Sequence, residues 1–185
     1  AALGVLSSWS IGGVFLSLGP RLVGDLLDSD NHLSGGLAMT ALAGSGAVAQ
    51  VLFHRAPAWR AASSGSLALA SGMAVIVVAI TTDLAWLFFA GAVLAGMGFG
   101  VAFLGALRQL MAVVPDHHRA EVMSAFYVVA YAALSVPALL AGLVVGPWGE
   151  TRTFQVLGGT VVVLALVVAV EAWRMRPRAV PAPGR

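Results

Sequence analysis

The stretch from Leu84 to Leu107 reads LAWLFFAGAVLAGMGFGVAFLGAL and contains no charged side chain. A helix of about 20 apolar residues is long enough to cross the hydrocarbon core of a bilayer. Five further stretches of this kind flank it, and a soluble domain of 185 residues has no room to bury all six. The sequence therefore predicts an all-α, multi-pass transmembrane bundle of six spans. The other five spans are Leu3–Leu27, Gly35–Phe53, Ala61–Thr81, Val122–Val145 and Phe154–Trp173.

The composition agrees with a membrane protein. Hydrophobic residues form 59% of the chain and charged residues only 10%, whereas soluble domains carry about 25% charged residues. The chain has no cysteine, which excludes disulfides, thiolate metal sites and a cysteine nucleophile. Its net charge of +2 comes from arginines spread over short loops. We therefore expect contact with a lipid bilayer and none with nucleic acid.

The arginines also predict the orientation of the chain in a cell (plasma or inner) membrane. With the N-terminus in the cytoplasm, eight arginines face the cytoplasm and only Arg21 and Arg152 face the opposite side, as the positive-inside rule requires. Six spans place both ends of the chain in the cytoplasm. Residues 1–173 would form the bundle and residues 174–185 a disordered cytoplasmic tail. The cytoplasmic arginines are Arg55, Arg60, Arg108, Arg119, Arg174, Arg176, Arg178 and Arg185.

Two helices are expected to carry a polar stripe. Hydroxyls spaced three or four residues apart share one helix face, and lipid offers them no partner. They are expected either to bond between helices or to line a substrate path. In the first span Arg21 is expected either to line a polar cavity or to extend to the headgroups. The stripes are Ser124, Tyr127, Tyr131 and Ser135 in the fifth span, and Ser7, Ser10, Ser17 and Arg21 in the first.

Small residues mark expected helix contacts. In the fourth span Ala92, Gly96 and Gly100 recur every four residues, with further glycines nearby. Small side chains let helix backbones approach closely inside lipid, where packing replaces the hydrophobic effect. A similar face in the second span is formed by Gly36, Thr40 and Gly44.

Nearly all of the sequence resembles the C-terminal half of the major facilitator superfamily. The closest similarity runs from Gly96 to Gly142, where a glycine-rich helix leads into a loop with Pro115 and an Arg-Ala pair, Arg119 and Ala120. Pro137 to Gly142 is similar to a proline–glycine motif of that family. The break HRAPAWR, His54 to Arg60, resembles its basic loop, with Arg55 and Arg60 in place but His54 and Pro57 at positions where aspartate and glycine are usual.

The resemblance implies a small-molecule transporter that works by alternating access, in the efflux direction among others, with no catalytic residue, metal or cofactor. The partners it implies are a small-molecule substrate and a missing N-terminal six-helix half, which the start of the chain inside an apolar segment also leads us to expect. Substrate-pathway residues would be Ser10, Ser17, Arg21, Ser124, Tyr127 and Tyr131. Cytoplasmic loop latches would be Arg55, Arg60, Arg108 and Arg119.

Three alternatives remain beside this interpretation. The chain could be a complete six-helix carrier or channel that dimerises, or a membrane subunit without transport activity. An intramembrane serine hydrolase of the rhomboid type is suggested only by Ser45, and it needs a histidine base on a neighbouring helix, which no span provides at its middle. His117 and His118 form a weak metal motif, because two adjacent histidines lack further ligands.

Overall fold

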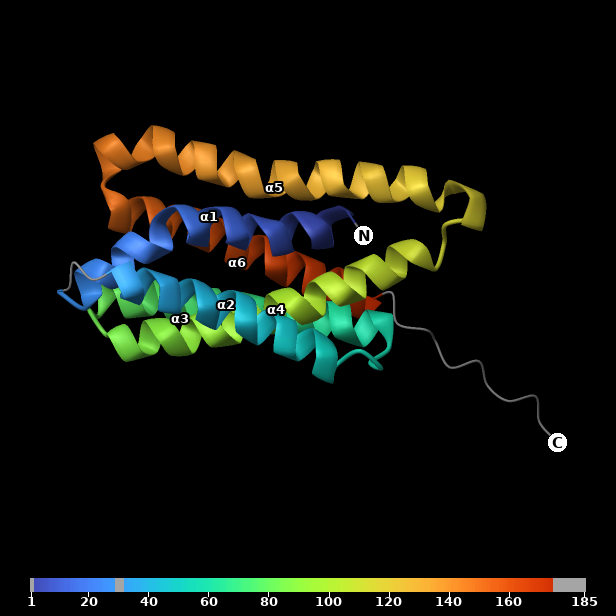
Figure 1. Ribbon diagram of the computed structural model, residues 1–185, viewed down its shortest axis with the longest axis horizontal. Helices are drawn as coiled ribbons and strands as arrows, with labels where there is room; N and C mark the ends of the chain where they lie inside the picture. The colour runs from blue at the N-terminus through green and yellow to red at the C-terminus, as the bar shows by residue number, and fades with distance from the viewer. Residues whose placement is uncertain (1, 29–31, 175–185) are drawn as a thin grey trace.

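The described residues of the computed structural model form six long α-helices and one short 3₁₀ turn (Figure 1). It describes the backbone of residues 2–28 and 32–174, and the side chains of residues 8–28 and 33–174. The helices run side by side in alternating directions, so that the bundle is elongated. Their bounds are α1 Ala2–Leu26, α2 His32–Leu52, α3 Ala58–Thr81, α4 Ala85–Met111, η1 Asp116–His118, α5 Arg119–Trp148 and α6 Glu150–Arg174.

The predicted helical segments are all present, and most of them extend further than the apolar stretch that predicted them. The fifth is the longest at 30 residues, or roughly 45 Å at 1.5 Å per residue. It begins at Arg119 and continues past Pro137. Gly149 alone separates α5 from α6, and its φ of 79° lies in the left-handed region that favours glycine. The tail predicted for residues 174–185 lies outside the described residues, except Arg174, which ends α6.

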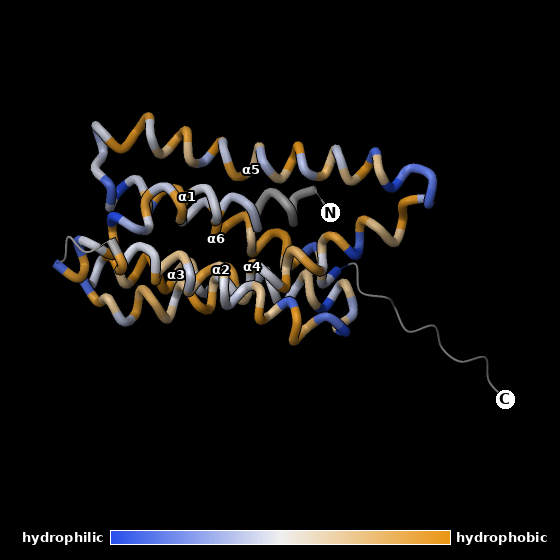
Figure 2. Tube along the Cα trace, viewed as in Figure 1, coloured by the Kyte–Doolittle hydropathy of each residue, from blue (hydrophilic) through white to orange (hydrophobic). Residues whose placement is uncertain are grey.

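Five of the six helices, α2 to α6, are long and apolar enough to cross a membrane. Figure 2 shows hydrophobic residues along the helices and hydrophilic residues gathered at their ends. The first helix is not among these five, which were identified within the described residues alone. A multi-pass membrane protein is therefore supported, and the sixth crossing stays a prediction.

The fourth helix packs closely against α3 through one face of glycines. A Cβ atom added at Gly98 would lie 2.6 Å from the Cα of Leu69, and one added at Gly105 would lie 2.7 Å from the Cα of Ala62. On the opposite side of the same interface, a Cβ at Gly72 of α3 would lie 2.6 Å from the Cα of Ala95. Backbone thus contacts backbone along α3 and α4, as small residues allow inside lipid.

A second glycine face of α4 packs against α2. Cβ atoms at Gly96 and Gly100 would collide with backbone atoms of Leu42 and Gly46. The predicted role of the small residues in the fourth span is therefore confirmed. The corresponding face of the second span makes no such contact within the described part of the chain, because a Cβ at Gly36 would meet nothing within 4 Å and one at Gly44 only Thr40 of its own helix. The contact is made by Gly46, on a different face of α2, so the Gly36–Thr40–Gly44 face is left uncovered.

The remaining helices close the bundle around large apolar side chains. The first helix packs on α5, where Gly13 meets the backbone of Leu134, and also on α6, α2 and α4. Phe15, Phe88 and Phe154 are fully buried where α1, α4 and α6 meet. Within the most apolar stretch of each helix, the buried share is 17% for α5 and 28% for α2, compared with 50% for α3 and for α4. The faces of α2 and α5 are therefore the least covered by the rest of the chain.

The sixth helix has one covered face and one open face. Val161, Ala165 and Ala169 are buried, whereas Val163 and Val170 are exposed. Its covered face lies mainly on α3, where Ser63 donates to the carbonyl of Ala169 at 3.3 Å. The open face is apolar.

Candidate functional site: the face of α1, α4 and α5

The polar residues predicted in the fifth span share one exposed face of α5. Ser124, Tyr127, Tyr131 and Ser135 are all exposed. The rings of Tyr127 and Tyr131 are 47% and 59% exposed, although α5 is apolar enough to cross a bilayer. Two exposed phenols on a helix that crosses a membrane require water, a ligand or another protein surface, because lipid tails offer their hydroxyls no hydrogen-bond partner.

The hydroxyls of the two stripes do not link helices within the described part of the chain. Ser124 donates to the carbonyl of Ala120 at 3.1 Å and Ser17 to the carbonyl of Val14 at 3.0 Å, each within its own helix. Tyr127 and Tyr131 make ring contacts, and their hydroxyls bond to no described residue. Among the described residues, the hydroxyls of both tyrosines and of Ser135 are thus polar groups of this face without a partner.

The two tyrosines belong to a cluster of aromatic rings in mutual contact, here called the aromatic ladder. Trp9 of α1 contacts Tyr131, with ring centroids 5.7 Å apart, and Phe103 of α4 at 6.0 Å. On α5 the rings of Tyr127 and Tyr131 lie 6.4 Å apart. Such pairs of rings stabilise their helix contacts by about 0.5–1.5 kcal/mol each. The six members of the ladder are Trp9, Phe99, Phe103, Phe126, Tyr127 and Tyr131.

Trp9 carries a buried donor without a partner. Its indole Nε1 is inaccessible to solvent and bonds to no acceptor. An unsatisfied buried donor costs about 1–3 kcal/mol. The aromatic ladder thus combines contacting rings with donors that lack a partner on Trp9, Tyr127 and Tyr131.

The polar residues of α1 are less exposed than those of α5. Ser10 is buried, Ser17 is half-buried, and the side chain of Ser7 lies outside the described residues. Arg21 lies at the far end of the helix, where its guanidinium pairs with the Glu150 carboxylate at 3.2 Å. It is 70% exposed in that pair, so it reaches the end of the bundle instead of pointing into its middle.

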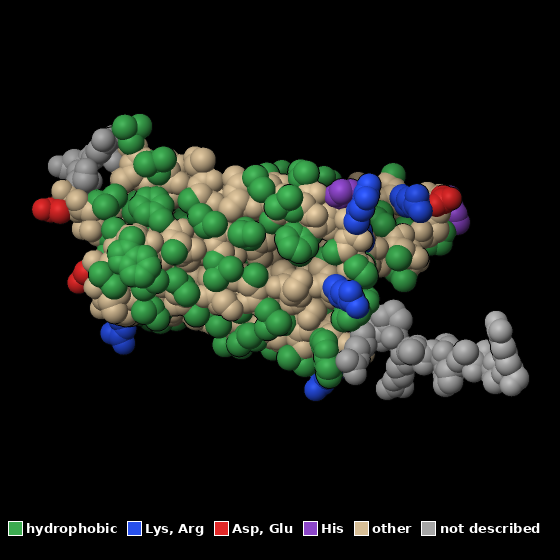
Figure 3. All heavy atoms as spheres, turned by 90° about the horizontal axis from the view of Figure 1, so that it is seen from below, with side chains coloured by type: hydrophobic (Ala, Val, Ile, Leu, Met, Phe, Trp, Pro, Cys, Tyr) green, Lys and Arg blue, Asp and Glu red, His purple; other side chains and the backbone are tan. Residues whose placement is uncertain are grey.

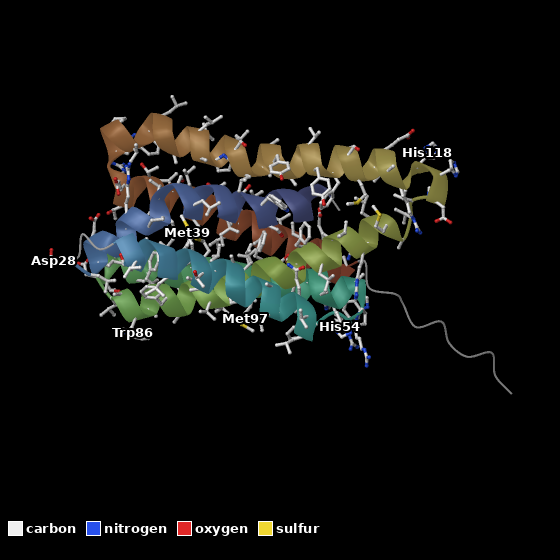
Figure 4. All side chains as sticks on the ribbon, in the orientation of Figure 1. Asp28, Met39, His54, Trp86, Met97 and His118 are labelled. Carbon is white, nitrogen blue, oxygen red and sulfur yellow. The ribbon has the colours of Figure 1, made fainter. Side chains whose placement is uncertain are left out.

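The predicted latch arginines lie at the other end of the bundle, which Figure 4 marks with His54 and His118. Arg108 of α4 donates to the carbonyl of Ala56 at 3.1 Å and also to that of His54, so it ties α4 to the loop after α2. Arg119 pairs with Asp116 at 2.9 Å within the next loop. Arg60 lies over the ring of Trp59 at 5.2 Å. Arg55 is exposed in the same loop.

Charged side chains gather at the two ends of the bundle in Figure 3, while its middle shows hydrophobic and uncharged surface. The spans contribute no charge at the level of the ladder: α1 up to Pro20, α4 up to Leu107 and α5 from Val122 carry neither acid nor base. The middle of the face is therefore neutral.

Ser45 has a structural role in the bundle. Its hydroxyl donates to the carbonyl of Leu42 at 3.1 Å and to that of Val93 in α4 at 3.0 Å. It therefore bridges α2 and α4. His118 bonds to Glu121 at 2.9 Å, and within the described residues no three potential ligands gather for a metal ion.

The four aromatic residues of the ladder that precede the tyrosines were not predicted as part of the site. Phe99 and Phe103 lie four residues apart, as do Tyr127 and Tyr131, a spacing that places each pair on one helix face. That pattern was available in the sequence. The contribution of Trp9 was not, because it depends on how α1 packs between α4 and α5.

The length, composition and packing of these helices define a multi-spanning helical membrane protein. The chain belongs to the PUCC protein family, which matches residues 27–120, just over half of its length. The match covers α2, α3, α4 and η1 and ends at the start of α5. No curated protein and no solved structure shows significant similarity to the chain.

The family match corrects the resemblance drawn from the sequence. The major facilitator superfamily is not the family that matches, and the motifs read as its basic loop and proline–glycine segment do not identify this chain. Glycine-rich helices, short arginine loops and helical prolines are common to many membrane bundles, which explains why they suggested the wrong family. The assignment of the chain as half of a twelve-helix protein of that superfamily falls with it.

Proposed function

We propose that this chain is part of a membrane carrier for small molecules, with its substrate path along the face of α1, α4 and α5. The exposed phenols of Tyr127 and Tyr131 carry this proposal. They lie on a helix long and apolar enough to cross a bilayer, at a level where a hydroxyl facing lipid is unfavourable. A water-filled or ligand-filled path supplies the polar surroundings that they need.

The open sides of α2 and α5 support a second part of the proposal. These helices are the least buried, and α2 exposes the Gly36–Thr40–Gly44 face. Small residues on a membrane helix favour close packing with another helix. A further helical unit therefore covers this face and forms the opposite wall of the path. The excess of arginines at the end of the bundle that carries His54 and His118 orients that end to the cytoplasm.

The absence of cysteine allows a direct test of the path. Tyr131→Cys and Val163→Cys form a matched pair, because the two native side chains are 59% and 60% exposed in the bundle. Methanethiosulfonate ethyltrimethylammonium, a charged reagent, reacts with the thiolate, which forms in water and not in lipid. In membranes containing the whole protein, the cysteine at 131 is expected to react quickly and the one at 163 slowly.

Equally slow reaction at both positions would show that α5 faces lipid, and would remove the proposed path. The orientation is tested with the same reagent on Arg119→Cys. In sealed cells this cysteine is expected to stay unmodified, since the proposal places it in the cytoplasm. Rapid labelling from outside would reverse the assigned orientation.

A second candidate function follows from the family match. The PUCC family is described as related to bacteriochlorophyll and light-harvesting complex assembly, so a role in handling pigment or assembling pigment–protein complexes is the alternative to transport. Expression in a bacterium that makes bacteriochlorophyll separates the two. Pigment that stays with the purified protein favours assembly, and its absence after purification removes this candidate.

A further inference from the structure

We propose that the aromatic ladder binds a neutral, flat, conjugated ring that carries carbonyl groups, a quinone-like molecule. This inference rests on the proposed carrier function, because it names the class of substrate that the same face accepts. Three features of the ladder define that class: its exposed rings, its unpaired donors and the absence of charge around it.

The rings determine the shape of the ligand. Tyr127 and Tyr131 are tilted by only 31° relative to one another, and both are about half exposed. Trp9 stands edge-on to Tyr131, with their planes at 61°. The two exposed tyrosine rings therefore offer aromatic faces of similar tilt, with the indole in contact with Tyr131. A flat conjugated ring gains offset stacking on such a surface, whereas a saturated ring of the same size does not.

The polar groups determine the chemistry of its edges. The hydroxyls of Tyr127 and Tyr131 bond to no described residue, and the Trp9 Nε1 donor is buried without an acceptor. The two phenols are exposed and can donate to a ligand, whereas the inaccessible Trp9 Nε1 leaves the indole to contribute through its ring. Carbonyl oxygens on the rim of the ligand accept hydrogen bonds from the two phenols.

The charges determine that the ligand is neutral. A lipophilic cation gains from aromatic faces, but its binding inside a membrane also calls for a carboxylate. The nearest acid along α5 is Glu121, which lies one turn before Ser124, is largely exposed and pairs with His118. The ladder segments of α1, α4 and α5 contain neither acid nor base. A neutral ligand complements this surface better than an ion of either sign.

The test uses 1,4-naphthoquinone as the probe and tryptophan fluorescence as the signal. Quinones normally add to thiols and amines, but this chain has no cysteine and no lysine, so quenching reports reversible binding. One variant retains only Trp9, with the other four tryptophans changed to phenylalanine. Its matched control retains only Trp86, which is 67% exposed at the other end of the bundle and reports simple partitioning of the probe into the membrane.

Quenching of Trp9 is expected to saturate with probe concentration, while quenching of Trp86 rises without saturation. In the Trp9 variant, Tyr127→Phe and Tyr131→Phe together keep both rings and remove both hydroxyls. They are expected to weaken binding by roughly tenfold or more, since each lost hydrogen bond is worth about 1 kcal/mol. Where a single-tryptophan variant does not fold, saturable thermal stabilisation of the unmodified chain by the probe, lost on the double Tyr→Phe change, gives the same answer.

Two outcomes overturn the inference. Unsaturable quenching of Trp9 that matches Trp86 would mean that no site exists at the ladder. Saturable binding of tetraphenylphosphonium in place of naphthoquinone would mean that the ligand is a cation. Either result leaves the Tyr131→Cys experiment untouched, so the ligand class and the proposed path fail separately.

Discussion

Replacing Gly98 with alanine should destabilise the bundle through a single added methyl group. The new Cβ would lie 2.6 Å from the Cα of Leu69 and 2.7 Å from the carbonyl carbon of Ala68, whereas carbon atoms normally approach to about 3.5–4.0 Å. These atoms are backbone, so the methyl group cannot be accommodated by turning a side chain. The axes of α3 and α4 must therefore move apart by about 1 Å to restore normal contact.

A gap of that size forfeits a quarter to a half of the dispersion energy of the contacts it opens, and overpacking of this kind costs about 1–3 kcal/mol. The free energy of unfolding is measured by denaturant titration in mixed micelles. Gly142→Ala is the matched control, because it adds the same methyl group to α5, where nothing lies within 4 Å. We expect that control to leave the bundle at least as stable as before, with a gain of up to about 1 kcal/mol because alanine has a higher helix propensity than glycine.

If Gly98→Ala proves as stable as the unmodified protein and as Gly142→Ala, then α3 and α4 do not touch through their backbones. The account of the α4 glycine faces would then be wrong. Gly72→Ala provides an independent check from the α3 side of the same interface, since its Cβ would lie 2.6 Å from the Cα of Ala95. The two substitutions are expected to act alike.

Three further predictions test other contacts. Arg108→Gln removes the guanidinium bonds to the carbonyls of His54 and Ala56, and since bonds to charged groups are worth about 1.5–3 kcal/mol, amide hydrogen exchange in the loop after α2 should speed up about tenfold or more; an unchanged rate would show that the latch does not hold this loop. Ser45→Ala, which loses the bond to Val93, should lower the free energy of unfolding by about 0.6 kcal/mol, the average for such bonds between membrane helices. Ser45 should not react with a fluorophosphonate, and covalent attachment of that reagent would revive the hydrolase interpretation. Arg21→Ala should lower the free energy of unfolding by less than about 1 kcal/mol, because its exposed pair with Glu150 is screened by water and salt; a larger loss, persisting at high salt, would contradict that account.

The local features of the fold could be predicted from the sequence. Six apolar segments gave six long helices, and the small residues of α4 were correctly assigned to helix contacts. The uncovered Gly36–Thr40–Gly44 face shows the limit of that reasoning. A repeat of small residues every four positions marks a face that permits close approach, but it does not say whether a neighbour is there.

The site depends more strongly on how distant segments come together. The spacing of Tyr127 and Tyr131 placed both on one face of a helix. Their contact with Trp9 depends on α1 lying beside α5, and the pair between Arg21 and Glu150 joins residues 129 positions apart in the chain. No local pattern encodes such contacts. The family could not be assigned from motifs either, because glycines, prolines and arginine loops serve the same physical purposes in unrelated membrane bundles.

The single-residue connection at Gly149 has a consequence for biosynthesis. With one residue between them, α5 and α6 leave no slack for one to enter the bilayer while the other waits outside, so they must insert together as a hairpin. In the orientation proposed above, with Arg119 in the cytoplasm, the bend then travels across the membrane ahead of both helices. The backbone of Gly149 is hydrogen-bonded within the bend, because its N–H donates to the Val145 carbonyl at 2.8 Å and its carbonyl accepts from the Thr153 hydroxyl at 2.7 Å. These polar groups therefore cross the membrane already paired.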